Sequence, residues 1–384
     1  MRINNKVCRF AKKIKQGIFK LKNMVLNTFK VILLTVLIVV NTVFLSAAEA
    51  TKNEKKESFN AKEMIMHHVK DAHDFHIVDW NNEPISISLP IIIWTNNGLT
   101  IFSSSEFHHD DSGLQIVEKN GYKFAKVHEK IYQLNNGAEA VEFNQEHHPE
   151  NASLPLDFSI TRNVFMMWIS VVILLFLFII SARKYKKSTD NVPTGIASFV
   201  EPLVVFVRDE IAKPMIGEHK YEKYMPYLLT VFFFIWINNI FGLIPIFNGA
   251  NVSGNIAFTL TLALCTFLIT IFSGNKNYWK HIFWMPGVPV PMKIFLMPIE
   301  LIGIFTKPVS LMIRLFANIT AGHIIILALM SLIFIFETVW VSPVSVAFSL
   351  FIGVIEIVVT AIQAYIFTVL SALYFGMATE EEHH

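Results

Sequence analysis

Five long apolar runs fill the chain from Asn163 to its end. The first, Val164–Ser181, contains no charged residue and is long enough as a helix to cross the hydrocarbon core of a bilayer, which is about 30 Å thick. The other four are Met225–Phe247, Ile256–Phe272, Ile299–Phe336 and Val344–Met377. The sequence therefore predicts an all-α polytopic membrane protein, with about five membrane helices in a domain that spans residues 161–384.

The last two runs are longer than a perpendicular crossing of the membrane requires. They contain 38 and 34 residues, so as helices they would measure about 57 Å and about 51 Å. Ser342-Pro343 separates them. Helices of this length tilt, bend or lie partly in the membrane plane. We expect two long, strongly tilted, antiparallel helices.

Composition excludes several other classes of protein. Of 384 residues, 53% are hydrophobic and 16% are charged, whereas soluble globular domains carry about 25% charged residues. The net charge of +2 gives no electrostatic support for nucleic-acid binding. Two cysteines are too few for a disulfide framework or a four-thiolate metal site. Neither of the common glycine-rich phosphate-binding motifs is present, so we expect no nucleotide site, no cofactor and no enzymatic activity in this chain.

The first fifty residues have the layout of a secretory signal peptide. Residues 1–30 carry nine Lys or Arg and no acid, an apolar run follows from Val31 to Leu45, and an alanine-rich stretch ends at Ala50. We therefore expect residues 1–50 to be removed on export. The basic region is unusually long, which a true start at Met24 would explain. An uncleaved membrane anchor is the alternative interpretation.

Residues 51–160 are polar and predict a small extracytoplasmic domain that is mainly β-structure. Three Asn-Gly pairs, which are typical hairpin turns, end at Gly98, Gly121 and Gly137. Between and around them lie short runs with strand character: Ile85–Trp94, Leu99–Phe102, Gly113–Val117, Tyr122–Val127 and Lys130–Leu134. A helical segment is expected before them, at Ala61–His68.

Basic residues predict the orientation in the membrane. The first run is followed at once by the cluster from Arg183 to Lys187, and the loop 274–293 carries three lysines and no acid. Such residues stay on the cytoplasmic side, so the first helix runs inward and the C-terminus is cytoplasmic. Residues 188–225 alternate apolar and charged side chains, which predicts a helix on the cytoplasmic surface; a simple connecting loop is the alternative.

Polar and charged side chains interrupt the apolar runs, where each charge costs at least about 2.5–3.5 kcal/mol and marks a functional site. The second run contains Asn238 and Asn239; the fourth contains Glu300, Lys307, Arg314, Asn318 and His323; the fifth contains Glu356 and Gln363. At about 100° per residue, the first four polar residues of the fourth run share one helix face, and its histidine points to the opposite face. Two different surroundings are therefore expected along this helix.

Arg314 and the pair His323 and Glu356 predict different chemistry. An arginine does not lose its proton, so it cannot relay one, but it attracts a carboxylate. No acid lies near Arg314 in sequence, so we expect its partner to be an acid on another chain. Histidine and glutamate can gain and lose protons when their surroundings favour it, and these two suit the passage of protons.

Two other functions compete with this interpretation. Nine of the 14 histidines lie in residues 51–160, and the groups around His73 and His108 could bind a transition metal, which would suit a metal-ion transporter. No closed metal-binding spacing supports that site, and we expect no bound metal. An intramembrane hydrolase could use Thr320 with His323, but the sequence offers no third group or oxyanion site.

The segment SLMIRLFANITAGH, from Ser310 to His323, resembles the signature of subunit a of F-type ATP synthases. The stretch Lys307–Ser310 just upstream and the closing stretch Gln363–Leu370 also match that family. The Asn238-Asn239 stretch is similar to the family's second span. The resemblance covers roughly residues 160–380.

The resemblance implies a proton-translocating stator subunit of a bacterial inner membrane, with two half-channels beside a ring of c subunits. Its other implied partners are the b-subunit peripheral stalk and the remaining synthase subunits. Arg314 would face the ring carboxylate, with Asn318 and Gln363 near that interface. Glu300 matches an acid of the cytoplasmic-side path, and protons are the expected coupling ion.

One departure from the family pattern concerns His323 and Glu356. Many bacterial members carry Glu at the first position and His at the second, so the two residue types are exchanged here. An exchanged pair keeps its chemistry if the two groups meet across the helices. The resemblance therefore implies that they form one site of the outer half-channel.

Overall fold

The computed structural model describes residues 70–80, 83–135, 138–144, 149–187, 195–244, 251–285, 287–336 and 341–380, together with Ile65. The expected signal peptide, the rest of the helical segment at 61–68 and the turn at Asn136-Gly137 lie outside the described residues.

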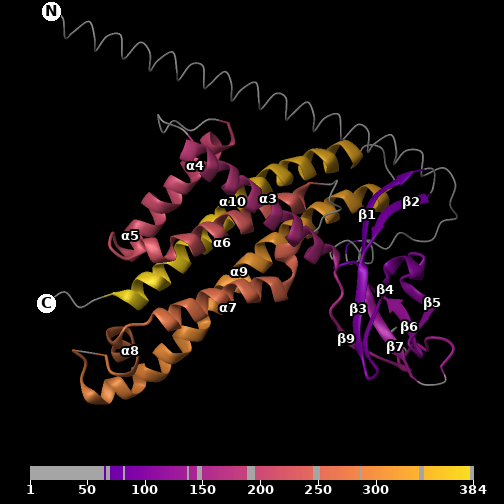
Figure 1. Cartoon of the computed structure of the whole chain (residues 1–384), viewed down its shortest axis with the longest axis horizontal. Helices are drawn as coiled ribbons and strands as arrows, with labels where there is room; N and C mark the ends of the chain where they lie inside the picture. The colour runs from indigo at the N-terminus through magenta and orange to yellow at the C-terminus, as the bar shows by residue number, and fades with distance from the viewer. Residues whose placement is uncertain are drawn as a thin grey trace, which may run out of the picture. The chain divides into compact units, whose positions relative to one another are not determined.

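In the described part of the chain, nine strands precede the helix that begins at Arg162. Figure 1 draws strands as arrows. They form three antiparallel sheets, with the orders β1-β2, β4-β3-β9 and β5-β6-β7-β8. Their bounds are β1 Asp74–Trp80, β2 Glu83–Ser88, β3 Pro90–Thr95, β4 Gly98–Ser103, β5 Ser112–Lys119, β6 Tyr122–Val127, β7 Lys130–Leu134, β8 Ala152–Ser153 and β9 Leu156–Asp157. A short 3₁₀ turn, Ser104–Phe107, follows β4.

Local sequence signals account for most of these strands. The expected Asn-Gly turns at Gly98 and Gly121 join β3 to β4 and β5 to β6, and both glycines have positive φ. The expected single strand Ile85–Trp94 is wrong, because it is two strands. Its break lies at Leu89, whose N–H and C=O bond Ser104 instead of a ladder partner. Pro90, which has no N–H to donate, begins the second strand.

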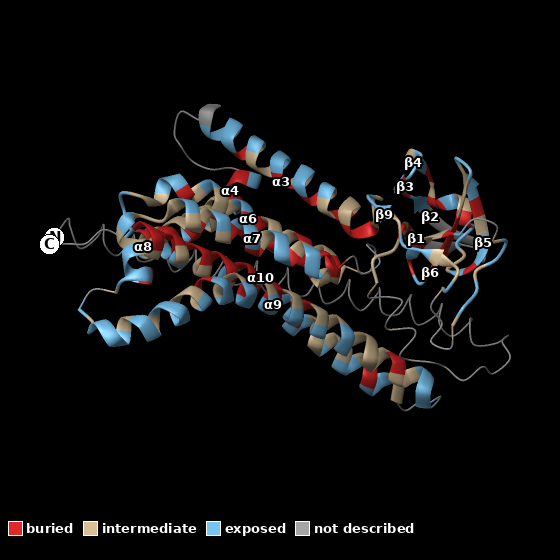
Figure 2. Cartoon of the chain, turned by 90° about the horizontal axis from the view of Figure 1, so that it is seen from below, coloured by how far each residue is buried: buried red, intermediate tan, exposed pale blue. Residues whose placement is uncertain are grey.

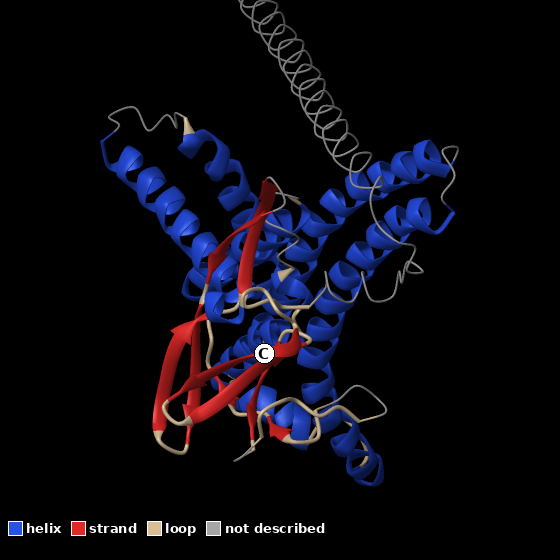
Figure 3. Ribbon diagram, turned by 90° about the vertical axis from the view of Figure 1, so that its right-hand side faces the viewer, coloured by secondary structure: helices blue, strands red, loops and turns tan. Residues whose placement is uncertain are grey.

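Most of the described chain from Arg162 onward is helical (Figure 3). Five of the described helices are long and apolar enough to cross a membrane. They are α3 Arg162–Lys187, α6 Tyr221–Leu243, α7 Ile256–Ser273, α9 Val290–Phe336 and α10 Val341–Thr379. The expected number of membrane helices is thus confirmed for the described part of the chain. A short helix, α8 Lys276–Phe283, lies in the loop before α9.

Helix α9 begins nine residues before the expected start at Ile299, and at 47 residues it measures about 70 Å. In the sequence, the uninterrupted apolar run begins only after Lys293 and Pro298. The helix already includes both of these residues. A proline removes one backbone hydrogen bond, which neighbouring groups in a membrane protein can compensate. Pro291 falls in the first turn, where no N–H is required. The tilt of α9 and α10 stays a prediction.

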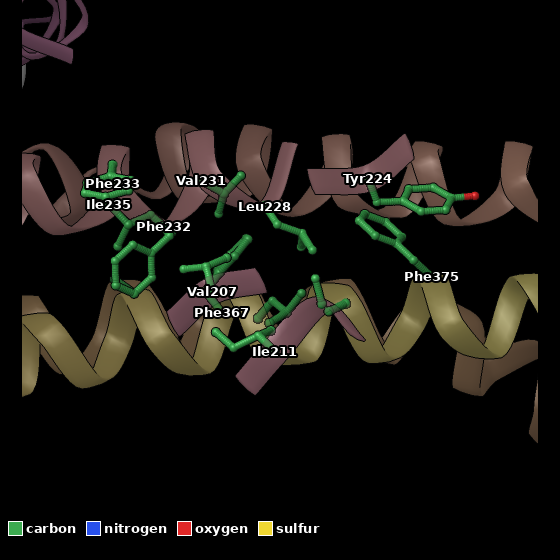
Figure 4. Packing of buried hydrophobic residues seen from close by; sticks show 14 of the residues in the cluster. Val207, Ile211, Tyr224, Leu228, Val231, Phe232, Phe233, Ile235, Phe367 and Phe375 are labelled. Atoms are coloured by element: carbon green, nitrogen blue, oxygen red, sulfur yellow. The ribbon is translucent and has the colours of Figure 1, made fainter. Parts of the chain in front are cut away.

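Residues 196–216 of the segment between α3 and α6 are helical, so the alternative of a simple connecting loop is wrong for this described part. It consists of α4 Ile196–Phe206, a π-helical turn Val207–Ala212 and α5 Lys213–Ile216. Val207 and Ile211 are fully buried in the core that α6 and α10 share (Figure 4). On the exposed side, Asp209 pairs with Arg208 and Lys213, and these hydrogen bonds lower the pKa of its carboxyl group.

The largest buried core joins α6 and α10, as the buried residues in Figure 2 illustrate. Tyr224 of α6 stacks on Phe375 of α10, with the ring centroids 4.9 Å apart. Next to it, α5 approaches α10 so closely that a Cβ added to Gly376 would collide with the carbonyl oxygen of Met215. Glycine is therefore required at this crossing.

The residues before β1 bond the start of α3. Asp71 accepts hydrogen bonds from the hydroxyl group of Thr161 at 2.8 Å and from the backbone N–H of Asn163 at 3.0 Å. Such a carboxylate satisfies free N–H groups and suits the positive end of the helix dipole. The guanidinium group of Arg162 donates to the carbonyl oxygen of Lys70 at 2.8 Å. These bonds hold the junction between the strands and the first membrane helix.

Candidate functional site

His323 of α9 and Glu356 of α10 meet across the two helices, as the exchange of residue types required. The imidazole Nδ1 lies 2.9 Å from the Oε1 atom of Glu356, whose side chain is 3% exposed. The other ring nitrogen, Nε2, lies 3.1 Å from the carbonyl oxygen of Gly242 in α6. Three helices therefore converge on one histidine.

The Gly242 contact determines where the protons of His323 lie. A carbonyl oxygen can only accept, so Nε2 carries a proton and donates it to Gly242. One further proton then lies between Nδ1 and Oε1, on either atom. If both atoms lost it, two acceptors would face each other at 2.9 Å without a hydrogen. The geometry thus holds one exchangeable proton at this position.

The end of α6 lies next to this pair. Gly242 is the last residue but one of α6, which ends at Leu243. The final carbonyl groups of a helix form the negative end of its dipole and stabilise a nearby cation, by about 0.3–1 kcal/mol at exposed sites and more when partly buried. The Nε2 atom of His323, whose side chain is 14% exposed, lies against this carbonyl end of α6.

Gly322 makes room for the carboxylate. A Cβ added to this residue would lie 2.6 Å from Oε1 of Glu356, which is closer than real Cβ atoms approach. The same addition at Gly303, the other glycine of α9, would meet no atom within 4 Å. Gly322 is thus required by the close approach of Glu356 to α9.

Several buried polar atoms near this pair have no protein partner within the described ranges. They are Oε2 of Glu356, Oγ1 of Thr320, Oγ of Ser349, Oδ1 of Asn238 and both amide atoms of Asn239. Thr320 and Asn239 lie one helical turn from His323 and Gly242, and Ser349 lies two turns before Glu356. Buried polar atoms of this kind are ordinarily satisfied by water. The pair therefore lies in a polar strip along three apolar helices.

Arg314 lies on the other side of α9. Leu311, Leu315 and Ile319 are buried in the core, whereas Arg314 and Asn318 are exposed on the face that turns away from it. Across the described part of the chain, no ion pair or hydrogen bond links Arg314 to an acid. The expected difference between the surroundings of Arg314 and His323 is thus present in the structure.

The remaining predicted site residues lie outside the His323–Glu356 contact. Lys307 lies over the ring of Tyr374 in α10, 5.7 Å from its centroid. Glu300 is half-buried near Tyr278 of α8; burial, and then the charge of Glu300, raise the pKa of that tyrosine. Gln363 is buried on α10, two turns after Glu356. Asn238 and Asn239 are buried in α6.

The histidines of residues 51–160 do not gather into a metal site where the structure describes them. His73 pairs with Asp157 at 3.3 Å and His109 with Asp74 at 3.2 Å, and no group of three potential ligands forms within the ranges described. Burial raises the pKa of Asp157, but bonds from His73 and Ser159 outweigh it, so the pKa is lowered. The side chains of His67, His68, His76, His147 and His148 are not described.

Sequence reasoning missed two contributions to the site. The carbonyl group of Gly242 is a backbone atom 81 residues before His323, so no residue type could signal it. In the sequence, Gly322 could be noticed only as part of the pair Ala321-Gly322 that precedes His323. The hydrolase alternative is wrong, because Glu356 and Gly242 occupy both ring nitrogens of His323 and Thr320 bonds neither of them.

Comparison with known proteins adds two family matches. A family model described as ATP synthase A chain matches residues 164–376, more than half of the 384 residues. A second model, described as a domain of unknown function, matches residues 64–158. The two matches are separated by residues 159–163, which lead into the first turn of α3.

Relatives named ATP synthase subunit a are similar over about three fifths to two thirds of the chain. ATP synthase subunit a of Chloroherpeton thalassium is 46% identical over 267 residues, which cover 67% of this chain and 79% of the relative. ATP synthase subunit a 2 of Prosthecochloris aestuarii is 47% identical over 249 residues, covering 63% and 75%. ATP synthase subunit a of Chlorobium phaeobacteroides strain BS1 is 50% identical over 235 residues, covering 59% and 68%.

Proposed function

The chain belongs to the ATP synthase A chain family and is a proton-translocating stator subunit of an F-type ATP synthase, and from this premise we propose how its residues move protons. Nothing in the comparisons supports the alternative of a metal-ion transporter. Membership also makes the chain a non-catalytic channel subunit and a multi-pass protein of the inner membrane. The proposal concerns the path of the proton and the partners that complete it.

We propose that His323 and Glu356 form one proton-transfer site of the outer half-channel. The observation that supports this is the 2.9 Å contact between Nδ1 of His323 and Oε1 of Glu356. The other ring nitrogen of His323 is bound to the carbonyl group of Gly242. A proton that arrives at Oε2 of Glu356 binds there while the shared proton stays between Nδ1 and Oε1, and its departure from Oε2 toward the next polar group returns the pair to its starting state, so the pair passes protons one at a time. Ser349, two turns before Glu356, and Asn239 and Thr320, one turn before Gly242 and His323, provide buried polar groups along the route.

Arg314 is proposed to face the carboxylate of a c-subunit ring. It lies exposed on α9 beside apolar residues such as Ile313, and it has no acidic partner in the described part of its own chain. In the membrane an arginine seeks a counterion, and it stabilises the ionised form of an acid that reaches it. It would also repel protons that take a direct route between the two half-channels.

The other polar residues are proposed to line the route near the ring and the cytoplasm. Asn318, one turn from Arg314, and buried Gln363 would lie near the ring interface, and Glu300 with Lys307 on the cytoplasmic-side path. The basic cluster Arg183–Lys187 at the end of α3 supports a cytoplasmic C-terminus and an extracytoplasmic strand domain. Tilted α9 and α10, 47 and 39 residues long, would follow the ring surface.

Purification of the intact assembly tests this function. In mild detergent, the chain is expected to copurify with a small ring-forming membrane protein that has an acidic residue at membrane depth, with a peripheral stalk subunit and with a soluble ATPase. Isolation of the chain alone, or with metal-binding partners, under conditions that keep related synthases intact would contradict the assignment.

Replacement of Gly322 by alanine is expected to slow proton movement without preventing assembly. The added Cβ displaces the carboxylate of Glu356, which breaks its bond to His323. Loss of a hydrogen bond between charged groups costs about 1.5–3 kcal/mol, so ATP-driven pumping in membrane vesicles should fall by roughly tenfold or more. Gly303→Ala, on the same helix with open space around it, is the matched control and should pump normally. Equal pumping by both variants would argue against this use of the pair.

A further inference from the structure

The sheet β4-β3-β9 carries a regular grid of apolar side chains on its outer face. Directly opposite residues share a face of a sheet, and the registers place Trp94 of β3 between Leu99 of β4 and Leu156 of β9. Ile92 likewise pairs with Ile101, and on its other side the backbone N–H of Phe158 bonds its carbonyl oxygen. The grid, called the outer face below, consists of Ile92, Trp94, Leu99, Ile101, Leu156 and Phe158.

The outer face is exposed although it contains no charged residue. Trp94 is 54% exposed and Phe158 is 61% exposed. The opposite face of the same sheet already forms the core of the domain, where Ile91, Ile93 and Phe102 pack on the sheet β5-β6-β7-β8. Strand β3 is thus apolar on both sides, a pattern typical of strands that are covered on both faces. Something is expected to cover the outer face as well.

The sheet β5-β6-β7-β8 has no comparable apolar grid at the exposed positions described below. In β5 and β6, Glu118 is directly opposite Lys123, so charged residues form a cross-strand pair there. Leu114 of β5 is 86% exposed but lies next to Gln115. A contiguous apolar patch on only one side of a domain marks a binding surface, whereas single exposed apolar residues do not.

The chain itself keeps the outer face close to the membrane. Phe158 precedes Arg162, the first residue of α3, by four residues, which can span at most about 14 Å when fully extended. The bonds of Asp71 to Thr161 and Asn163 fix this junction further. Phe158 and Leu156 therefore lie within reach of the headgroup region, on whichever side of the membrane the domain lies.

We propose that the outer face rests on the lipid surface around the start of α3. Tryptophan and other aromatic side chains favour the membrane interface, and an apolar surface there sinks about 5–10 Å into the boundary between headgroups and acyl chains. The strand domain would then be attached to the bilayer in two ways, through the chain that leads into α3 and through the outer face. These two attachments together would fix its orientation at the membrane. This inference does not depend on the route of the proton.

Site-directed spin labelling of the assembled complex in liposomes tests the proposal. Single cysteines replace Trp94, Phe158 or, as a matched control, Leu114, in a chain whose Cys8 and Cys265 are changed to serine. Labels at the first two positions are expected to be several-fold more accessible to dissolved oxygen, and several-fold less accessible to a water-soluble nickel chelate, than the label at Leu114. Each variant should still pump protons, because none of these residues belongs to the proton path.

Two results would overturn the proposal. If the labels at Trp94 and Phe158 meet the nickel chelate as freely as the label at Leu114, the outer face is in water. If they are shielded from both reagents, a protein covers it. A lipid-borne photoreactive probe on the unmodified chain provides an independent readout: adducts should form on the segments with Trp94 and Phe158 and not on β5.

Discussion

Replacement of Arg314 by alanine is expected to abolish ATP-driven proton pumping in membrane vesicles, while the soluble ATPase part continues to hydrolyse ATP. The guanidinium group is the cation that would hold a ring carboxylate in its ionised form at the stator. Without it, the acid keeps its proton and the exchange between the half-channels stops. Insertion should not suffer, because a charge at the membrane centre costs about 2.5–3.5 kcal/mol that the variant no longer bears.

Arg208→Ala is the matched control for this loss. Arg208 lies in the π-helical turn after α4, is 42% exposed and pairs with its neighbour Asp209. An exposed ion pair of this kind contributes little, so the control should assemble and pump like the unchanged chain. Proton pumping by the Arg314→Ala variant that remained coupled to ATP hydrolysis would refute the role given to Arg314.

Exchange of His323 and Glu356 is expected to restore much of the pumping that either single change removes. His323→Glu alone places two carboxylates face to face, and Glu356→His alone places two imidazoles there. Either change removes the complementary donor and acceptor, which now lie 2.9 Å apart. The double exchange places one of each type at the site again. Coupling between contacting residues is worth about 0.5–3 kcal/mol, so the double variant should exceed the weaker single variant by about 2- to 150-fold in pumping rate.

Recovery is expected to be incomplete, because Gly242 offers only a carbonyl acceptor to the residue on α9. An ionised glutamate at position 323 would have no proton to donate to it. Ser331→Ala on the same helix is the control, since that hydroxyl group bonds only the carbonyl oxygen of Ala328 among the described residues. If the double exchange pumps no better than the weaker single variant, His323 and Glu356 do not form one site.

The sequence predicted those parts of the site that depend on residue type. A charge in an apolar run is costly enough to stand out, which is why Arg314, His323 and Glu356 can be identified from the order of residues alone. The exchanged residue types also predicted that the last two meet, and their 2.9 Å contact agrees with this. Helical periodicity also predicted that Arg314 and His323 have different surroundings. The two residues are nine positions apart, and at about 100° per residue this separation places them on opposite faces of a helix.

Features set by backbone contacts between distant segments could not be predicted. The proton on Nε2 of His323 depends on a carbonyl group at the end of α6, and neither the helix end nor its approach to α9 has a signature in the sequence. The early start of α9 was missed because the uninterrupted apolar run begins only after Lys293 and Pro298, whereas the helix begins before both residues. The break at Leu89 depends on bonds to Ser104, which lies 15 residues later.

The most direct measurement is the distance from the guanidinium group of Arg314 to the nearest carboxylate, in a cryo-electron microscopy structure of the whole synthase in lipid. The account predicts that this carboxylate belongs to a ring subunit and comes within about 4 Å at one rotational position, which is ion-pair distance. A guanidinium group bound instead to Glu300 or Glu356 of its own chain, or directed into bulk water at every position of the ring, would contradict it.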